Sequence, residues 1–268
     1  AFSLIILTPN RQAYAVRDRF GIYPLYFTTN PFRISDDLES FNNFSVSHNA
    51  IRLYTCLQYV PEPLTIYDKV FAVTPGHLLK YDGQIVTSSL LLSSSLIPQP
   101  VIQISKNKQL LHTALFESVE KALNHDLNSG VYLSGGIDSS ILTAIASKIR
   151  TDVKAYTVGF EAPNFHGEVQ DARRFADFLK IELIEKTYTF NDFADAFYPT
   201  IKALSTPLAD PCAVAVFLLA KMASKQTNTI LSGEGADELF CGYKPYSTTV
   251  WSRRFGNTHN LVNNLLYP

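Results

Sequence analysis

Hydrophobic and polar residues follow different patterns in the two parts of the chain. Residues 1 to about 90 contain short β-like runs that are separated by turn residues such as Pro9-Asn10 and Asp82-Gly83. A single helical stretch near residues 50–59 interrupts these runs. The pattern predicts a mostly-β unit whose strands include the runs AFSLIIL, QAYAV, PLYFTT and GHLLKYDGQIV.

From residue 109 onward the pattern alternates between helix and strand. A helix over 109–125 precedes the short apolar strand VYLS, and the helix after it places Ile141, Leu142, Ile145 and Ile149 on one face. This alternation predicts an α/β fold in which a parallel sheet is covered by helices on both faces. The further strands are KAYTVGF, IELIEKTYT and TILS, and the further helices cover residues 168–180, 191–204 and 213–226.

A serine- and proline-marked stretch separates the two patterns. It reads LLLSSSLIPQPVIQISKNK over residues 90–108 and has the composition of a linker. We therefore predict one domain over residues 1–92, a linker over 93–108 and a second domain over 109–268.

The amino-acid composition disfavours several kinds of binding partner. The 268 residues are 46% hydrophobic and carry a formal net charge of −1, which indicates a globular protein without a nucleic-acid-binding surface. No apolar run reaches the length of a membrane span. The three cysteines are far apart, which disfavours a disulfide framework and a zinc site, and each is expected to be a buried structural residue. Together these features predict a cytoplasmic protein with no membrane partner.

The first candidate site is the stretch LSGGIDSS at residues 133–140, between a strand and a helix. Ser134, Gly135 and Gly136 can form a tight turn with outward-facing N–H groups, which would cradle an anion. Ser139 falls in the first helical turn, where the helix dipole favours phosphate. Asp138 would repel phosphate unless a cation such as Mg²⁺ lies between them. The alternative, a capped helix after an ordinary turn, stays open.

The second candidate site is the stretch LSGEGADELFCGY at residues 231–243. Glu234, Asp237 and Glu238 lie within five residues, and carboxylates this close repel one another. Both stretches follow strands, and ligands of parallel sheets bind beyond the carboxyl ends of the strands. The acids therefore suggest metal or proton chemistry, although an acidic helix N-terminus would have the same composition.

These motifs resemble known enzymes. S-G-G-x-D-S is similar to the pyrophosphate loop of the N-type ATP pyrophosphatases, and S-G-E-G-A-D-E-L-F-x-G-Y resembles the asparagine synthetase family. TVGF and PLADPCAV fit the same family. Upstream, VRDRFGIYPLYF, ISDDLESF and VTPGHLLKYDG resemble the C-terminal part of its class II glutamine amidotransferase domain, which has an Ntn-type fold.

The resemblance implies an ATP-dependent carbon–nitrogen ligase for asparagine biosynthesis, with ATP and Mg²⁺ as cofactors. Aspartate would be adenylated to β-aspartyl-AMP with release of pyrophosphate, and ammonia from glutamine would displace AMP. Glu234 would accept a proton during this amidation, and Asp138 and Asp237 would hold Mg²⁺. Family positions that contact ATP correspond to Leu133, Ser134, Gly135, Gly136, Asp138, Ser139, Val158, Ser232 and Gly233. A homodimer is also expected.

Some positions depart from the family pattern. Residue 1 is Ala1, whereas the amidotransferase domain begins with a nucleophilic cysteine, and the chain ends at Pro268, before a family lysine. We therefore expect an interior fragment, and whether it is active alone stays open. Asp210, before Pro211, could contact the amino-acid substrate, but the preferred interpretation is a turn or cap residue. Two other interpretations remain: a β-lactam synthetase-like adenylating ligase, and a catalytically incomplete nucleotide-binding or interaction module.

Overall fold

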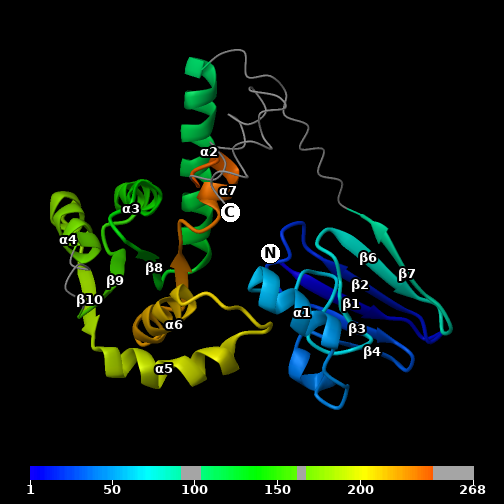
Figure 1. Cartoon of the computed structure of the whole chain (residues 1–268). Helices are drawn as coiled ribbons and strands as arrows, with labels where there is room; N and C mark the ends of the chain where they lie inside the picture. The colour runs from blue at the N-terminus through cyan, green and yellow to red at the C-terminus, as the bar shows by residue number, and fades with distance from the viewer. Residues whose placement is uncertain (92–103, 162–166, 244–268) are drawn as a thin grey trace, which may run out of the picture. The chain divides into compact units, whose positions relative to one another are not determined.

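The computed structural model describes residues 1–91, 104–161 and 167–243 (Figure 1). The chain forms two compact units: Ala1–Ile102 with Asn191–Phe217, and Gln103–Phe190 with Leu218–Pro268. Most of the predicted linker over 93–108 lies outside the described residues, and so does the predicted second domain beyond residue 243. Helix α2 begins at Ile104, inside that linker. The domain limits 1–92 and 109–268 stay predictions.

Residues 1–91 of the first unit are mostly β, as predicted. Its four-stranded antiparallel sheet has the order β1-β2-β6-β7, and a second, three-stranded sheet has the order β4-β3-β5. The predicted helical stretch is α1, which begins two residues early, at His48, because the Ser47 side chain caps it. The elements are β1 Ser3–Leu7, β2 Ala13–Arg17, β3 Tyr26–Thr29, β4 Phe32–Ser35, the 3-10 helix η1 Leu38–Phe41, α1 His48–Leu57, β5 Val70–Ala72, β6 His77–Tyr81 and β7 Val86–Leu90.

Two small hydrophobic cores hold this unit together. One contains Ala15 and Leu79 from the four-stranded sheet, with Phe27 and Phe32 of the other sheet packed against it. This arrangement places the two sheets face to face. The other core lies under η1 and contains Tyr26, Leu38, Phe41, Val70 and Ala72.

The RDRFG motif stabilises the first unit through two buried charged side chains. Arg17 is only 6% exposed, and its guanidinium donates to the backbone oxygens of Gly21, Tyr23 and Val73 and to Glu62. Asp18 is equally buried and accepts hydrogen bonds from three backbone N–H groups, those of Phe2, Phe20 and Ile22. Burial opposes the charge of Asp18, but these donors outweigh it and lower its pKa. The motif is thus structural here.

The second unit contains a parallel sheet with the order β10-β9-β8-β11. Strand β8 comes first in the chain, β9 and β10 lie on one side of it, and β11 pairs on the other side. The strand order therefore reverses at β8, and ligands bind at such a switch point. The elements are α2 Ile104–His125, β8 Ser129–Tyr132, α3 Ile137–Ile149, β9 Lys154–Phe160, α4 Gly167–Leu179, β10 Leu183–Tyr188, β11 Thr229–Leu231 and α7 Ala236–Phe240.

Helices cover both faces of this sheet, as predicted. The face that includes Val131 and Ala155 packs against α2, α3 and α4 in one continuous core. Tyr188 points to the opposite face, where its hydroxyl donates to Leu218 of α6 (Cys212–Ala223). Helix α5 (Phe190–Ala203) belongs to the first unit from Asn191 onward, and so does α6 up to Phe217. The second unit is therefore a doubly wound parallel α/β sheet.

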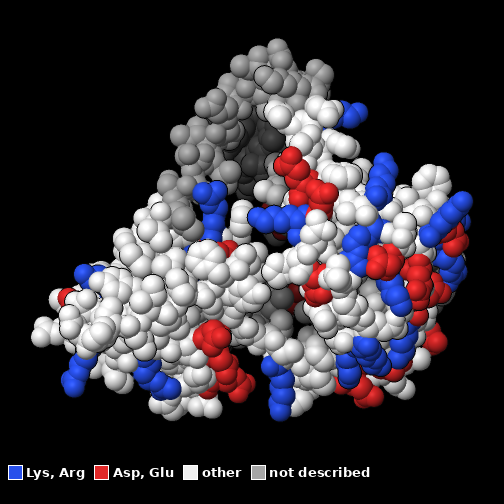
Figure 2. Space-filling model, turned by 180° about the vertical axis from the view of Figure 1, so that it is seen from behind, with Lys and Arg blue, Asp and Glu red and all other residues white. Residues whose placement is uncertain are grey.

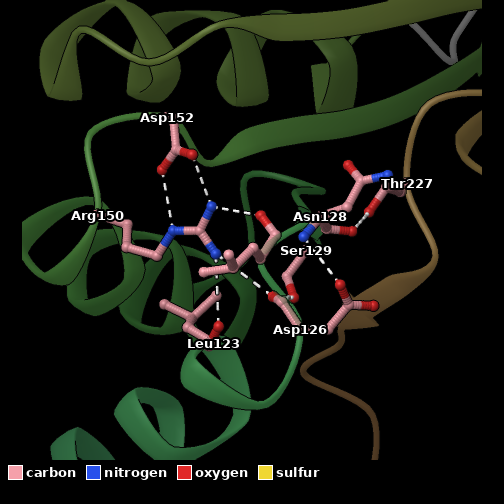
Figure 3. A network of polar contacts seen from close by, with 8 residues as sticks. Leu123, Asp126, Asn128, Ser129, Arg150, Asp152 and Thr227 are labelled. Carbon is pink, nitrogen blue, oxygen red and sulfur yellow. Dashed lines mark hydrogen bonds and ion pairs between the residues drawn. The ribbon is translucent and has the colours of Figure 1, made fainter.

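Polar side chains fasten the amino ends of β8 and β11 (Figure 3). The guanidinium of Arg150 donates to the carbonyl oxygens of Leu123, in the last turn of α2, and of Asp126 and Leu127, just after it. It also forms an ion pair with Asp152. The carboxylate of Asp126 accepts from the Thr229 hydroxyl at 2.7 Å, which ties α2 to β11. These bonds hold the two strands whose opposite ends carry the candidate site.

Candidate nucleotide site

The first loop is closed by its own serines. The hydroxyls of Ser134 and Ser139 lie 3.0 Å apart, and the Ser139 hydroxyl also accepts from the Ser134 N–H and donates to the Gly136 carbonyl. The N–H of Gly136 donates back to the Ser134 hydroxyl. Ser139 is buried, so its hydroxyl shapes the loop from inside, whereas Ser134 is exposed. The local turn predicted for this stretch is present.

Backbone donors are available where this loop enters α3. The N-cap residue is Gly136, and no side chain caps the helix. The first N–H groups of a helix have no partner within the helix, and an uncapped end leaves them available to an anion. Asp138 lies in this first turn and is half-buried. The capping role considered for Asp138 is therefore absent, and the donors suit phosphate.

Gly135 is needed for the shape of the loop. Its φ is +82°, and a Cβ there would lie 2.7 Å from Cβ of Asp171 and 2.9 Å from N of Ala172 in α4. Such a distance is below normal van der Waals contact, and side chains rarely adopt this φ. The loop therefore lies directly against α4 and tolerates only glycine at this position.

The second loop touches the first. A Cβ built on Gly233 would lie 3.2 Å from the backbone N of Ser139 and 3.3 Å from Cβ of Asp138. These short distances show that the backbone after β11 approaches the first turn of α3, as the switch-point topology requires. The structure thus brings together two loops separated by about a hundred residues of sequence, which approach each other closely at Gly233.

Tyr243 contacts one of the acidic residues of the second loop. Its hydroxyl donates to Glu238 at 3.1 Å, and this hydrogen bond and the charge of Glu238 raise the pKa of Tyr243. The charges of Asp237 and Glu234 contribute to the same rise of the pKa. The Glu234 backbone is held by the Ser232 hydroxyl, which accepts from its N–H. The loop therefore presents a local field of negative charge.

The residues predicted near adenine and ribose occupy different environments. Leu133 is 1% exposed, and its side chain belongs to the core, so that only its backbone could face a ligand. Val158 in β9 is half-buried, and Ser232 is exposed. Sequence reasoning missed Tyr243 and Asp171, although the closeness of Tyr243 to three acids was readable from the motif.

The acids suit a metal only together with phosphate. Among the described residues no group of three or more His, Cys, Asp or Glu side chains could hold an ion by itself. Mg²⁺ is, however, commonly bound by one or two carboxylates plus substrate phosphates. Asp138 and Asp237, on loops that touch, fit such a site, with the remaining ligands coming from the phosphates and water.

The three cysteines and Asp210 lie at exposed positions. Cys56, Cys212 and Cys241 were expected to be buried, which is wrong: all three are exposed. They lie on the outer side of α1, at the first residue of α6 and at the end of α7, so no core surrounds them. The interpretation of Asp210 as a cap residue is confirmed, because its carboxylate accepts from the Cys212 N–H at 2.9 Å.

The molecular surface agrees with the low net charge. In the view of Figure 2, acidic and basic side chains are interspersed rather than gathered into a patch of one sign. No helix in the described part of the chain is long and apolar enough to cross a membrane.

Family models match both parts of the chain. The model for asparagine synthase matches residues 110–266, and the model for a glutamine amidotransferase domain matches residues 1–90. The chain belongs to the asparagine synthase family. The match includes both loops of the candidate site, so their contact at Gly233 lies within the region that the family model covers.

Relatives within the asparagine synthase family include two bacterial proteins. The chain is 34% identical to asparagine synthetase [glutamine-hydrolyzing] 1 of Bacillus subtilis over 91% of its length, and 31% identical to a putative asparagine synthetase of Mycobacterium bovis over 92%. It spans 40% of the length of each relative. Among solved structures, an NH3-dependent NAD synthetase from Campylobacter jejuni matches 50% of this chain and 60% of its own, at 20% identity and a TM-score of 0.37.

Proposed function

We propose that this chain is the part of an asparagine-forming ligase that activates aspartate with ATP. The contact between the two loops carries the proposal: Gly233 approaches Ser139 and Asp138 at the switch point of a parallel sheet. Uncapped helix donors on one loop and carboxylates on the other provide what a magnesium–triphosphate complex requires. Ser134, Gly135, Gly136 and Ser139 would form the phosphate cradle.

In the proposed reaction the side-chain carboxylate of aspartate attacks the α-phosphorus of ATP. The bond to the β-phosphate breaks, and β-aspartyl-AMP and pyrophosphate form. Both reactants are anions, so the backbone donors at the start of α3 would hold the departing pyrophosphate. Mg²⁺, held by Asp138 and Asp237, would neutralise phosphate charge. Leu133, Val158, Ser232 and Gly233 would border the adenosine.

Amide formation then needs a proton acceptor. Ammonia attacks the carbonyl carbon of β-aspartyl-AMP, AMP leaves with the electrons of the carbon–oxygen bond, and the nitrogen loses a proton. Glu234 is exposed in the loop that faces the cradle, and a neighbouring hydroxyl fixes its backbone. We assign it this role. The amidotransferase match over residues 1–90 supports glutamine as the source of the ammonia.

Exchange of labelled pyrophosphate into ATP tests the proposal. The intact gene product that carries this chain should exchange pyrophosphate only when L-aspartate and Mg²⁺ are both present. Asp138→Asn should reduce exchange strongly, whereas Glu120→Gln, an exposed carboxylate on α2, should leave it unchanged. Aspartate-independent exchange, or equal exchange in Asp138→Asn, would contradict the proposal.

The same assay separates the two other functions. A β-lactam synthetase-like ligase would exchange pyrophosphate with carboxyethylated amino acids and not with aspartate. A nucleotide-binding or interaction module would bind ATP without any exchange. A cytoplasmic location and a homodimer are proposed from the family alone, and sedimentation of the purified protein tests the dimer.

A further inference from the structure

A cavity of about 520 Å³ lies in the first unit, and none of the residues that line it is assigned to the nucleotide. Its wall includes Tyr54 of α1, Tyr67, and Phe197 and Ile201 of α5. Every residue that lines it belongs to the first unit. The wall is mostly apolar and aromatic, which is typical of sites for small organic molecules, and the volume falls within the usual range for such sites.

The charges on this wall have one sign. Glu39 of η1 and Asp210, just before α6, line the cavity, and its lining contains no Lys, Arg or His among the residues that the structure describes. Two carboxylates without a basic residue repel phosphates and carboxylates and attract cations. Aromatic rings favour cations as well, because the ring face carries negative charge. ATP, pyrophosphate and acidic amino acids are therefore poor occupants.

The wall around Asp210 is fixed by contacts with the β-rich part of the unit. The N–H of Ala209 donates to the Gln58 carbonyl at 2.8 Å, and Leu208 pairs with Tyr59 in a β-bridge. The Ser205 side chain forms a hydrogen bond with Tyr26, a residue that is 3% exposed. The segment that carries Asp210 is therefore held in place by several hydrogen bonds before any ligand binds, which lowers the entropic cost of binding.

We propose that this cavity binds a small organic cation: a primary ammonium group on a compact aliphatic or aromatic body. The ammonium group would lie toward Glu39 and Asp210, where charge-assisted hydrogen bonds form. The body would fill the apolar space between Tyr54, Tyr67 and Phe197. None of the residues that line this site belongs to the two nucleotide loops, so its binding test does not depend on the nucleotide assignment.

Three small ligands of similar shape but different charge test the proposal on the 268-residue chain. Saturation-transfer NMR titrations would compare 2-phenylethylammonium, 2-phenylethanol and phenylacetate, which differ mainly in charge. We expect the amine to bind about tenfold more tightly than the alcohol, the factor that ~1.4 kcal/mol corresponds to. Phenylacetate should bind most weakly. Equal affinities, or tightest binding of phenylacetate, would overturn the proposal.

Variants that remove one charge each test whether the amine binds in this cavity. Asp210→Asn keeps an oxygen that can accept from the Cys212 N–H, and Glu39→Gln keeps the side-chain length, so both remove charge with little change of structure. Each variant should weaken binding of the amine several-fold, and the double variant should weaken it to about the affinity of the alcohol. Binding of the alcohol should be unchanged in all of them. Asp68→Asn, an exposed carboxylate of the same unit outside the cavity, is the matched control.

A cavity-filling variant tests the location of the bound ligand independently of charge. Ala213 lines the cavity, and Ala213→Phe should abolish binding of the amine and the alcohol alike. Circular dichroism and urea unfolding show whether this variant folds. If this variant does not fold, the two charge variants still decide whether the ligand binds in the cavity. Amine binding that is unchanged in both of them would place the ligand elsewhere and refute the site.

Discussion

At the scale of single residues, the candidate site depends on glycines that allow its loops to approach their neighbours closely. Gly233 lets one loop reach the first turn of α3, and Gly135 lets the other loop lie against α4. The sequence motifs predicted both glycines as ligand-binding residues. They could not show that each is also required by a neighbouring backbone, because that neighbour is far away in the chain.

Glu234→Gln should leave ATP binding nearly unchanged and slow amide formation. The amide side chain keeps the size of Glu234 but accepts no proton, and loss of a general base typically costs ~10²–10⁴ in rate. Asparagine formation and ATP–pyrophosphate exchange should be measured side by side in the intact gene product. Unchanged asparagine formation would reject the role of Glu234.

Gly135→Ala should destabilise the second unit and weaken ATP binding. The new Cβ would meet Cβ of Asp171 at 2.7 Å in addition to the unfavourable φ of +82°. A residue held in such a backbone region costs roughly 1–3 kcal/mol. Gly83→Ala is the matched control, because its φ is +106° and no atom lies within 4 Å of its Cβ. Equal losses in urea unfolding for the two variants would contradict the contact with α4.

At the scale of elements, periodicity predicted most of the second unit. The strand KAYTVGF matches β9 residue for residue, and the helix predicted over 168–180 matches α4, Gly167–Leu179, within one residue at each end. Both are long segments with clear patterns. The three-residue strand β5 was missed, and the five-residue helix α7 was weighed only as an acidic helix N-terminus, because both are too short to show a period.

Strands β8 and β11 should loosen at low pH. Hydrogen bonds from Thr229 and Asn128 lower the pKa of Asp126, and the hydrogen bond from Arg150 lowers the pKa of Asp152. A carboxylate with a lowered pKa in the folded state stabilises the fold above its unfolded pKa of about 3.9. That stabilisation is lost as the pH falls through the folded pKa.

Urea unfolding followed at several pH values between about 6 and 3 checks this expectation. The free energy of unfolding should fall below about pH 4. Asp126→Asn should show a shallower fall, since one of the titrating groups is gone. Thr229→Val, which removes the first donor to Asp126, should have the same effect in part. A steeper fall in either variant would be inconsistent with the assigned cause.

At the scale of the whole molecule, the sequence predicted two parts but not how the chain divides between them. Residues 191–217 follow the α/β pattern, yet they belong to the first unit. The pairing of Leu208 with Tyr59 and of Ala209 with Gln58 accounts for this. Such contacts join segments separated by about 150 residues, and no local pattern reveals them.

Arg17→Met should destabilise the first unit and leave the nucleotide site of the second unit unaffected. Arg17 is buried and bonded to Glu62 and to three carbonyl oxygens, and loss of hydrogen bonds to a charged group costs about 1.5–3 kcal/mol. Arg52→Met, an exposed arginine on α1, should change little. Urea unfolding and ATP titration measure the two effects, and reduced ATP affinity in folded Arg17→Met would contradict the separation.

The central claim is that the loops at 133–140 and 231–243 hold one magnesium–ATP complex. Calorimetric titration of ATP in the presence of Mg²⁺ into the chain and into Asp138→Asn, Asp237→Asn and the double variant tests it most directly. If both carboxylates bind the same ion, the double variant should lose little more affinity than either single variant, because neighbouring groups are not additive. Strictly additive losses, or ATP affinity that does not depend on Mg²⁺, would contradict the account.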